Sequence, residues 1–335
     1  MPAKTGDQPL CTITPDIVRL VAEICEASGR LSATTDSTKA LKLRRINRIR
    51  TIKGSLAIEG NTLSEAQITA ILDGKQVIAP PREIQEARNA IKAYDNFQKW
   101  RPESERDLLH AHLILMNGLV DDAGKYRNGG VGVVAGEKVI HVAPPATRIP
   151  LLTEKLLQWL KSTDLHPLVA SSVFHYEFEY IHPFADGNGR MGRLWQTLIL
   201  TRWNKLFADI PVESLIHQHQ AEYYTALQDS TEQVDCAPFV TCMLQMILDA
   251  LPTPQATPQV TPQVEQLLRV IESEMSRDQL QTALGLRDRK SFRERYLKPA
   301  IAENLIQMTV PDKPSSRLQK YVLTDLGKIW LAQNA

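Results

Sequence analysis

The twelve residues from His182 to Arg193 constrain this chain more than any other feature of its sequence. They read His-Pro-Phe-Ala-Asp-Gly-Asn-Gly-Arg-Met-Gly-Arg and pass directly into a helical pattern. Gly187 and Gly189 let backbone N–H groups converge on one point, and the start of a helix adds its positive dipole end there. The segment therefore predicts a turn that opens a helix and binds an anion.

The side chains of this run suit a polyphosphate. Arg190 and Arg193 stand three positions apart, so they share one helix face and can hold different phosphate oxygens. Asp186 offers the hard oxygen ligand that Mg²⁺ prefers when it also binds phosphates. His182 is suited to accept a proton near neutral pH. Together these residues predict a nucleotide-polyphosphate site with a base beside it.

The run resembles the signature of the Fic family, H-x-F-x-[D/E]-G-N-G-R-x-x-R, and matches each of its fixed positions. The resemblance implies transfer of AMP from ATP to a serine, threonine or tyrosine hydroxyl of a protein, with self-modification included. In the related Doc branch, which phosphorylates, a lysine occupies the place of Gly189. The glycine therefore favours AMP transfer.

The resemblance also implies a role for each residue of the run. His182 would deprotonate the hydroxyl, Phe184 would anchor the loop, and Asp186 would hold Mg²⁺, or alternatively Mn²⁺, between the α- and β-phosphates. The phosphates themselves would be held by the backbone of Gly187, Asn188 and Gly189, the Asn188 side chain, Arg190 and Arg193. Arg193 would receive the γ-phosphate.

A second segment, Ser55-Leu-Ala-Ile-Glu59-Gly60, ends a helical pattern that begins near residue 36. Ser55 and Glu59 share one helix face, and Gly60 stands where a helix would end. The segment resembles the Fic inhibitory motif, [S/T]-x-x-x-E-[G/N]. The resemblance implies that Glu59 pairs with Arg193 and misplaces the triphosphate. Some family members with this glutamate also remove AMP, and that alternative stays open.

Two further segments are assigned to the site through the family. The β-branched run at 131–140 predicts a hairpin, which resembles the Fic flap that aligns a target segment; Val133 or Val134 would then face the nucleotide. Tyr223 and Tyr224 lie in a helical pattern, and the resemblance puts an adenine- or ribose-lining aromatic there. Structural roles for the hairpin and the tyrosines stay open.

Helical patterns dominate the chain, so we expect a mainly α fold: a Fic helical bundle with a small β-hairpin flap, followed by a winged-helix domain. We expect an N-terminal helical region over 1–110 with an inhibitory helix at about 36–60, a catalytic core over 111–250 and a Thr/Pro/Gln linker over 251–262. The expected helices of the first part are 15–28, 36–59, 64–72, 81–99, 104–118, 150–162, 166–181, 188–205, 219–229 and 236–250.

Residues 263–335 form a separate module. Helical patterns at 263–274, 277–284, 288–297 and 299–305 precede strands at 306–310 and 319–323, which resembles a winged helix. The helix at 288–297 and the predicted wing are basic, with Arg287, Arg289, Lys290, Arg293, Arg295, Lys298, Lys313, Arg317 and Lys320. One hypothesis is that residues 263–335 bind DNA, and the other is that they dock a protein partner.

The remaining composition fits a cytoplasmic protein that binds no membrane. No apolar stretch is long enough to span a bilayer, and the polar start is no signal peptide. The four cysteines show no metal-ligand spacing. ATP and a protein target are the expected partners, and a homodimer is open. The rival hypothesis is a DNA-binding regulator whose Fic core senses ATP. The histidine at position 182 argues against it, because a sensor needs no base there.

Overall fold

The computed structural model describes residues 9–34, 37–130, 132–135, 138–251, 260–271, 273–286, 288–303, 305–310, 316 and 319–333. These residues form two compact units, one up to residue 251 and the other from residue 260 onward. The predicted Thr/Pro/Gln linker falls mostly on 252–259, outside the described residues. The chain is mainly α-helical, as predicted.

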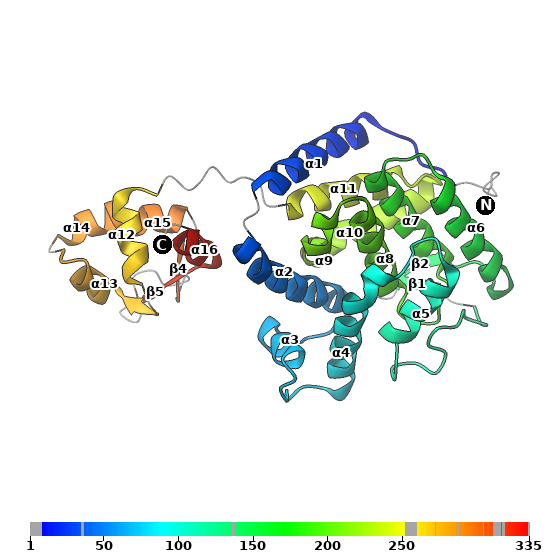
Figure 1. Cartoon of the computed structure of the whole chain (residues 1–335), viewed down its shortest axis with the longest axis horizontal. Helices are drawn as coiled ribbons and strands as arrows, with labels where there is room; N and C mark the ends of the chain where they lie inside the picture. Colours follow the sequence, from blue (N-terminus) through cyan, green and yellow to red (C-terminus); the bar gives the residue numbers. More distant parts are fainter. Residues whose placement is uncertain are drawn as a thin grey trace. The chain divides into compact units, whose positions relative to one another are not determined.

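The first unit is a bundle of helices (Figure 1). Its helices are α1 (Pro15–Thr34), α2 (Ser37–Ile58), α3 (Glu65–Leu72), α4 (Pro81–Asn96), α5 (Glu105–Leu115), α6 (Ile149–Ser162), α7 (Pro167–Ile181), α8 (Asn188–Trp203), α9 (Val212–Gln218), α10 (Gln220–Gln233) and α11 (Ala237–Ala250). Among the described helices of the chain, none is long and apolar enough to cross a membrane.

Helices α7 and α8 form the centre of this bundle. All residues from 168 to 178 in α7 and from 190 to 201 in α8 are buried. A helix that is buried on all sides has neighbours on all sides, and α7 contacts α1, α6, α8 and α11. The loop that joins α7 to α8 is the predicted anion-binding turn. The site therefore stands on the two most enclosed helices of the unit.

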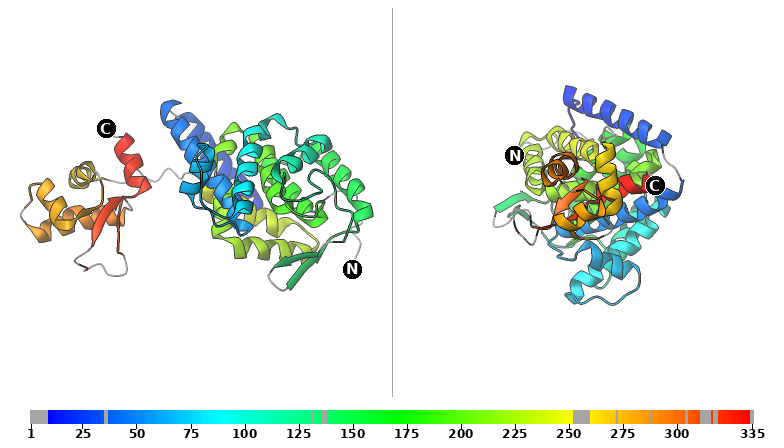
Figure 2. Two further views of the ribbon diagram at one scale, coloured as in Figure 1. Left: turned by 90° about the horizontal axis from the view of Figure 1, so that it is seen from below. Right: turned by 90° about the vertical axis from the view of Figure 1, so that its left-hand side faces the viewer.

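The predicted hairpin is present and stands out from the bundle (Figure 2). Strands β1 (Gly132–Ala135) and β2 (Lys138–Val142) pair antiparallel, with Gly132 opposite Val142 and a register shift between Val133 and Val134. The side chains of this hairpin lie outside the described part of the structure. The expected contact of Val133 or Val134 with a nucleotide therefore stays a prediction.

The second unit combines helices with a three-stranded sheet. Its elements are α12 (Pro262–Val270), β3 (Met275–Ser276), α13 (Arg277–Ala283), α14 (Arg289–Phe292), α15 (Lys298–Ala302), β4 (Ile306–Met308), β5 (Lys320–Leu323) and α16 (Asp325–Gln333). A π-helical turn, Arg293–Leu297, joins α14 to α15. The sheet is antiparallel, in the order β3-β5-β4. Leu267, Leu280 and Phe292 are fully buried in the hydrophobic core of this second unit.

Helix α2 crosses α9 with almost no space between their backbones. A Cβ added at Gly54 would lie 2.6 Å from the backbone carbonyl carbon of Glu213 and from the nitrogen of Ser214. Two hydrogen bonds fix the same packing: Asn47 Nδ2 donates to the Asp209 carbonyl at 2.8 Å, and Ser214 Oγ donates to the Arg50 carbonyl at 3.0 Å. A side chain at position 54 would push the two helices apart.

We expect Gly54→Ala to lower the free energy of unfolding by about 1–3 kcal/mol, because its Cβ overlaps rigid backbone atoms. Scanning calorimetry of the full chain would measure this as a lower unfolding temperature. Gly29→Ala is the matched control, since nothing lies within 4 Å of its added Cβ. In that exposed helix position alanine should stabilise by about 0.5–1 kcal/mol. Equal unfolding temperatures for the two variants would contradict the packing argument.

Candidate active site

The loop between α7 and α8 is shaped by two residues in the left-handed region. His182 follows the last residue of α7 with φ 51° and ψ 63°, and its N–H donates to the Phe178 carbonyl at 2.9 Å. Gly187 has φ 83° and caps the N-terminus of α8. A Cβ at Gly187 would lie 2.6 Å from Met116 Sδ, so only glycine fits. A non-glycine residue in this conformation is uncommon, so the position of His182 is consistent with the predicted functional turn.

The side chain of Asn188 braces this loop. Its Nδ2 donates to the Phe184 carbonyl at 2.9 Å, and its Oδ1 accepts from the Phe184 N–H at 2.9 Å. Asn188 is also buried. The phosphate contact expected for the Asn188 side chain stays a prediction. The N–H groups of Asn188, Gly189 and Arg190 begin α8, where helical N–H groups have no intrahelical partner.

Phe184 is fully buried and stacks on His112, with ring centroids 3.6 Å apart. His112 Nδ1 accepts from the Gly124 N–H at 2.8 Å, which leaves Nε2–H to donate to the Asp186 carbonyl at 3.0 Å. Burial lowers the pKa of His112 to about 4, so the ring is neutral at physiological pH. His112, on α5, thus supports the loop, a role that its sequence context did not indicate.

Arg127 is a second supporting residue that no sequence pattern indicated. Its guanidinium is buried and donates to backbone carbonyl groups. Nε donates to His182 at 2.7 Å, Nη1 to Gly129 at 2.7 Å and Nη2 to Pro144 at 2.6 Å. Its own N–H donates to the Pro183 carbonyl at 2.9 Å. Gly129 and Pro144 flank the β1–β2 hairpin. One side chain therefore ties both ends of the hairpin to the backbone of His182.

Asp186 lies beside two arginines. Its Oδ1 accepts from the Gly187 N–H at 2.6 Å and from Arg190 Nη2 at 3.1 Å, and its Oδ2 lies 3.4 Å from Arg82 Nη2. The Arg190 side chain is only 4% exposed, and its Nη1 lies 3.6 Å from Glu86 Oε1. Within the described residues, Arg190 Nε and Nη1 have no hydrogen-bond partner. These N–H groups suit an anionic ligand.

Arg193 meets the end of α2. Its Nη2 donates to Glu59 Oε1 at 2.7 Å and to the Ser55 carbonyl at 3.1 Å, and its Nε donates to Ser55 Oγ at 3.3 Å. The Arg193 side chain is 2% exposed and that of Glu59 32%. Burial alone would lower the pKa of Arg193, but the Glu59 charge raises it overall, so the guanidinium keeps its proton. Gly60, with φ 86°, ends the helical turn there.

Gly189 lies directly against this ion pair. A Cβ at this position would stand 2.7 Å from Glu59 Oε1 and 2.9 Å from Arg193 Nη1. The space that a side chain would occupy is therefore filled by the carboxylate and the guanidinium. Glycine at 189 thus permits the pairing of Glu59 with Arg193, in addition to leaving the backbone open to a ligand.

The two tyrosines differ in their surroundings. Tyr223 is buried, its hydroxyl lies 3.2 Å from His175 Nε2, and its ring packs 5.6 Å from that of Phe239. Tyr223 therefore belongs to the interior behind Arg193. Tyr224 is half-buried, with its ring 5.3 Å from that of Tyr223. A nucleotide contact of either tyrosine stays a prediction.

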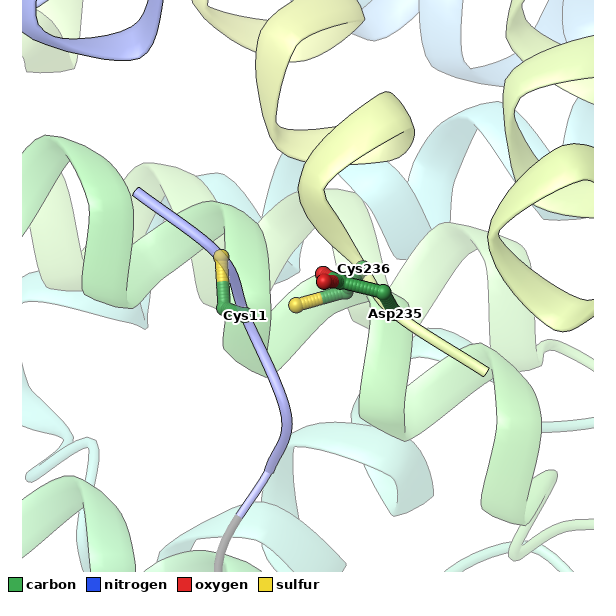
Figure 3. Close-up of side chains that lie close together, drawn as sticks. All are labelled: Cys11, Asp235 and Cys236. Atoms are coloured by element: carbon green, nitrogen blue, oxygen red, sulfur yellow. The ribbon is translucent and has the colours of Figure 1, made fainter. Parts of the chain in front are cut away.

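Cys11, Asp235 and Cys236 also lie close together, with side-chain atoms within 4.8 Å of one another (Figure 3). No sequence pattern indicated this cluster, because Cys11 is far from the other two in the chain. The Asp235 carboxylate already accepts from Thr12 N at 3.0 Å, from Thr12 Oγ1 at 2.5 Å and from the Ala237 N–H at 2.9 Å. These hydrogen bonds attach the segment before α1 to the start of α11, and this attachment explains why the three side chains lie together.

Comparison with known proteins identifies both units. A model of the Fic/DOC family matches residues 102–200, and a model described as "Filamentation induced by cAMP protein Fic-like, C-terminal domain" matches residues 262–324. "Protein adenylyltransferase Fic" of Aedes aegypti is 32% identical over 225 residues, and that of Drosophila mojavensis is 30% identical over 246 residues. These matches cover 63% and 68% of this chain but 42% and 46% of those proteins. The chain thus spans less than half the length of these relatives.

A solved structure extends the similarity over almost the whole chain. It is a Fic family protein from Desulfovibrio desulfuricans G20, with 53% identity and a TM-score of 0.71. The match covers 95% of this chain and 98% of that protein's chain. With identity at this level over both units, and with the signature loop built as described above, the chain belongs to the Fic family.

Proposed function

We propose that this protein transfers AMP from ATP to a serine, threonine or tyrosine hydroxyl of a protein, with the chain itself among its acceptors. The observation that carries the proposal is the α7–α8 loop, which joins His182 to a helix N-terminus flanked by two buried arginines. The name adenylyltransferase given to the insect relatives supports the same chemistry.

His182 is the base in this proposal. It accepts the hydroxyl proton while the hydroxyl oxygen bonds to the α-phosphorus, and the bond from that phosphorus to the bridging oxygen breaks to release diphosphate. A base contributes here only if it is held in line with the acceptor. Arg127 supplies that rigidity, because its 2.7 Å bond to the His182 carbonyl fixes the backbone that carries the imidazole.

The phosphates bind through the start of α8 and its arginines. The N–H groups of residues 188–190 face the α- and β-phosphates, and the Asn188 side chain braces the loop that presents them. Arg190 offers Nε and Nη1, which lack hydrogen-bond partners within the described residues. Arg193 receives the γ-phosphate once Glu59 has left. Charge neutralisation of this kind supplies most of the catalysis in attack at phosphorus.

Asp186 fits a divalent cation. Its side chain is 39% exposed, and its Oδ2 is engaged only loosely by Arg82 at 3.4 Å, so an oxygen ligand faces the solvent-accessible side of the loop. Mg²⁺, or Mn²⁺, would be held by Asp186 together with phosphate oxygens and water. The ion would neutralise charge on the α- and β-phosphates.

We further propose that Glu59 inhibits the enzyme. Its carboxylate occupies the guanidinium of Arg193 at 2.7 Å and stands against Gly189, which is the space that a γ-phosphate would need. ATP can still bind through α8, but its phosphates are then misaligned for in-line attack. A carboxylate at this place is also suited to orient a water molecule, which makes AMP removal an alternative role for Glu59.

The second unit is, in our proposal, a winged helix that selects the target or partner. Three helical segments followed by the β4–β5 hairpin support this fold. Exposed basic residues favour DNA as a second candidate partner; they are Arg289, Lys290, Arg293, Arg295 and Lys298. Arg287, Lys313 and Arg317, also named from the sequence, lie outside the described residues. The free state of the four cysteines supports a cytoplasmic location.

We expect Glu59→Gly to raise the rate of AMP transfer at least roughly tenfold, because removing a charged competitor from Arg193 should release on the order of 1–3 kcal/mol. Autolabelling with ATP labelled at the α-phosphate measures the rate. Glu65→Gly is the control, since Glu65 is exposed and its carboxylate lies 3.9 Å from the ammonium group of Lys53. Equal rates for wild type and Glu59→Gly would end the inhibitory proposal, and loss of AMP release from labelled protein in that variant would support the alternative role.

In the Glu59→Gly background, label should reach protein from α-labelled ATP and not from γ-labelled ATP. His182→Ala should reduce this transfer about a hundredfold or more, since it removes the general base. ATP affinity, measured by calorimetry, should stay nearly unchanged. His217→Ala, at an exposed position of α9, is the control. Label from the γ position would indicate kinase chemistry, and no transfer from either position would favour the ATP-sensing regulator.

If the second unit binds DNA, the full chain should bind random duplex with an affinity that falls steeply as salt rises. The double variant Arg289→Glu, Arg293→Glu should weaken binding and flatten the salt slope by about one for each phosphate that is no longer neutralised. Arg19→Glu, Arg30→Glu on α1 makes the same charge change in the first unit. Binding that is weak and insensitive to salt, or equal in the two double variants, would leave protein docking as the role of this unit.

A further inference from the structure

Glu179 is a buried carboxyl group with no assigned task. It lies on the last turn of α7, three residues before His182, and its side chain is 11% exposed. Within the described residues, its Oε1 is buried without a hydrogen-bond partner. A buried carboxyl without a partner costs stability. Its presence beside the loop therefore calls for a functional explanation.

Two histidines face this carboxyl group. His182 Nδ1 lies 3.9 Å from Glu179 Oε2, and His175 Nε2 lies 3.8 Å from Oε1. His175 is neutral, because burial lowers its pKa to about 3. Its Nδ1 lies 2.8 Å from Gln196 Oε1 and therefore carries the proton, which leaves Nε2 to accept from the Tyr223 hydroxyl. Of the two rings, His182 is the one that can donate to Glu179.

We propose that Glu179 is a positioning residue for His182 in the AMP transfer proposed above, on which this inference rests. The Glu179 carboxylate accepts from His182 Nδ1–H and so turns Nε2 toward the incoming hydroxyl. When Nε2 takes the hydroxyl proton, the carboxylate stabilises the imidazolium and takes no proton itself. The 3.9 Å separation is longer than a hydrogen bond. Such bonds are often long until the substrate is in place, and a small rotation of either side chain closes this one.

The charges around Glu179 link this role to inhibition. Arg193 on α8, Glu59 at the end of α2, Tyr223 on α10 and the neutral His175 on α7 all face it. Burial raises the pKa of Glu179 to about 7, Arg193 opposes the rise, and Glu59 adds to it. The ionised form is thus lost as pH falls through about 7. Removing Glu59 should favour the ionised form.

The kinetic test uses the full chain in the Glu59→Gly background. Glu179→Gln should lower kcat about tenfold or more while ATP affinity stays within about twofold, because the base is retained but no longer oriented. The acidic limb of log kcat against pH should become shallower, from a slope approaching about two to about one, since one of two coupled groups no longer titrates. Glu179→Asp should recover part of kcat. Glu177→Gln, a buried glutamate on the same helix, is the matched control.

A second measurement does not depend on catalysis. In the wild-type chain with ¹⁵N-labelled histidine, NMR should show His182 as the Nδ1–H tautomer, with its ring titrating at lower pH in Glu179→Gln. An Nε2–H tautomer in the wild type would overturn the proposal even if Glu179→Gln proved unstable. An unchanged pH profile and ring titration in the folded variant would overturn it as well. Absence of AMP transfer in the Glu59→Gly parent would count against the proposed function alone, because the tautomer still tests Glu179.

Discussion

The buried charge of Arg193 is the constraint on which the rest of this site depends. A guanidinium that is 2% exposed at the centre of a helical bundle must have an anionic partner, because an uncompensated buried charge costs several kcal/mol. In this structure the partner is Glu59, brought by α2 and supported by Ser55. If Glu59 leaves, another anion must take its place, and a phosphate is the anion that the neighbouring helix N-terminus favours. In the proposed mechanism, inhibition by Glu59 and binding of a phosphate are therefore two ways of neutralising the same buried charge.

The sequence predicted the site best where its residues are contiguous. The run from His182 to Arg193 carries the base, the carboxylate and the arginines in one turn and one helix, so spacing alone indicated their arrangement. The pairing of Glu59 with Arg193 rested on the family resemblance. By contrast, Arg127 and His112 act only through contacts formed by folding. No sequence pattern distinguishes an arginine that donates to carbonyl groups, or a neutral histidine that stacks on a phenylalanine, from other arginines and histidines.

The fold shows the same division. The long helices and the β1–β2 hairpin were predicted, because periodicity and turn residues mark them over many positions. Several short elements were missed, among them α9, with seven residues, β3, with two, and α16 after the last strand. An element of one or two turns carries too few apolar positions to show a period, and its conformation is decided by packing. The bonds of Asn188 to Phe184 were not predicted for a similar reason, since they depend on how the loop closes.

The contacts of Arg127 bear on how the β1–β2 hairpin is attached to the α7–α8 loop. Because one guanidinium binds the backbone just before β1, just after β2 and at His182, the hairpin is joined to the α7–α8 loop at both of its ends. The strands between Gly129 and Pro144 could then be exchanged or lengthened as a cassette, while the two anchoring carbonyls keep their places. In the proposed function, a change of target would then alter the hairpin and leave the loop that carries His182 in place.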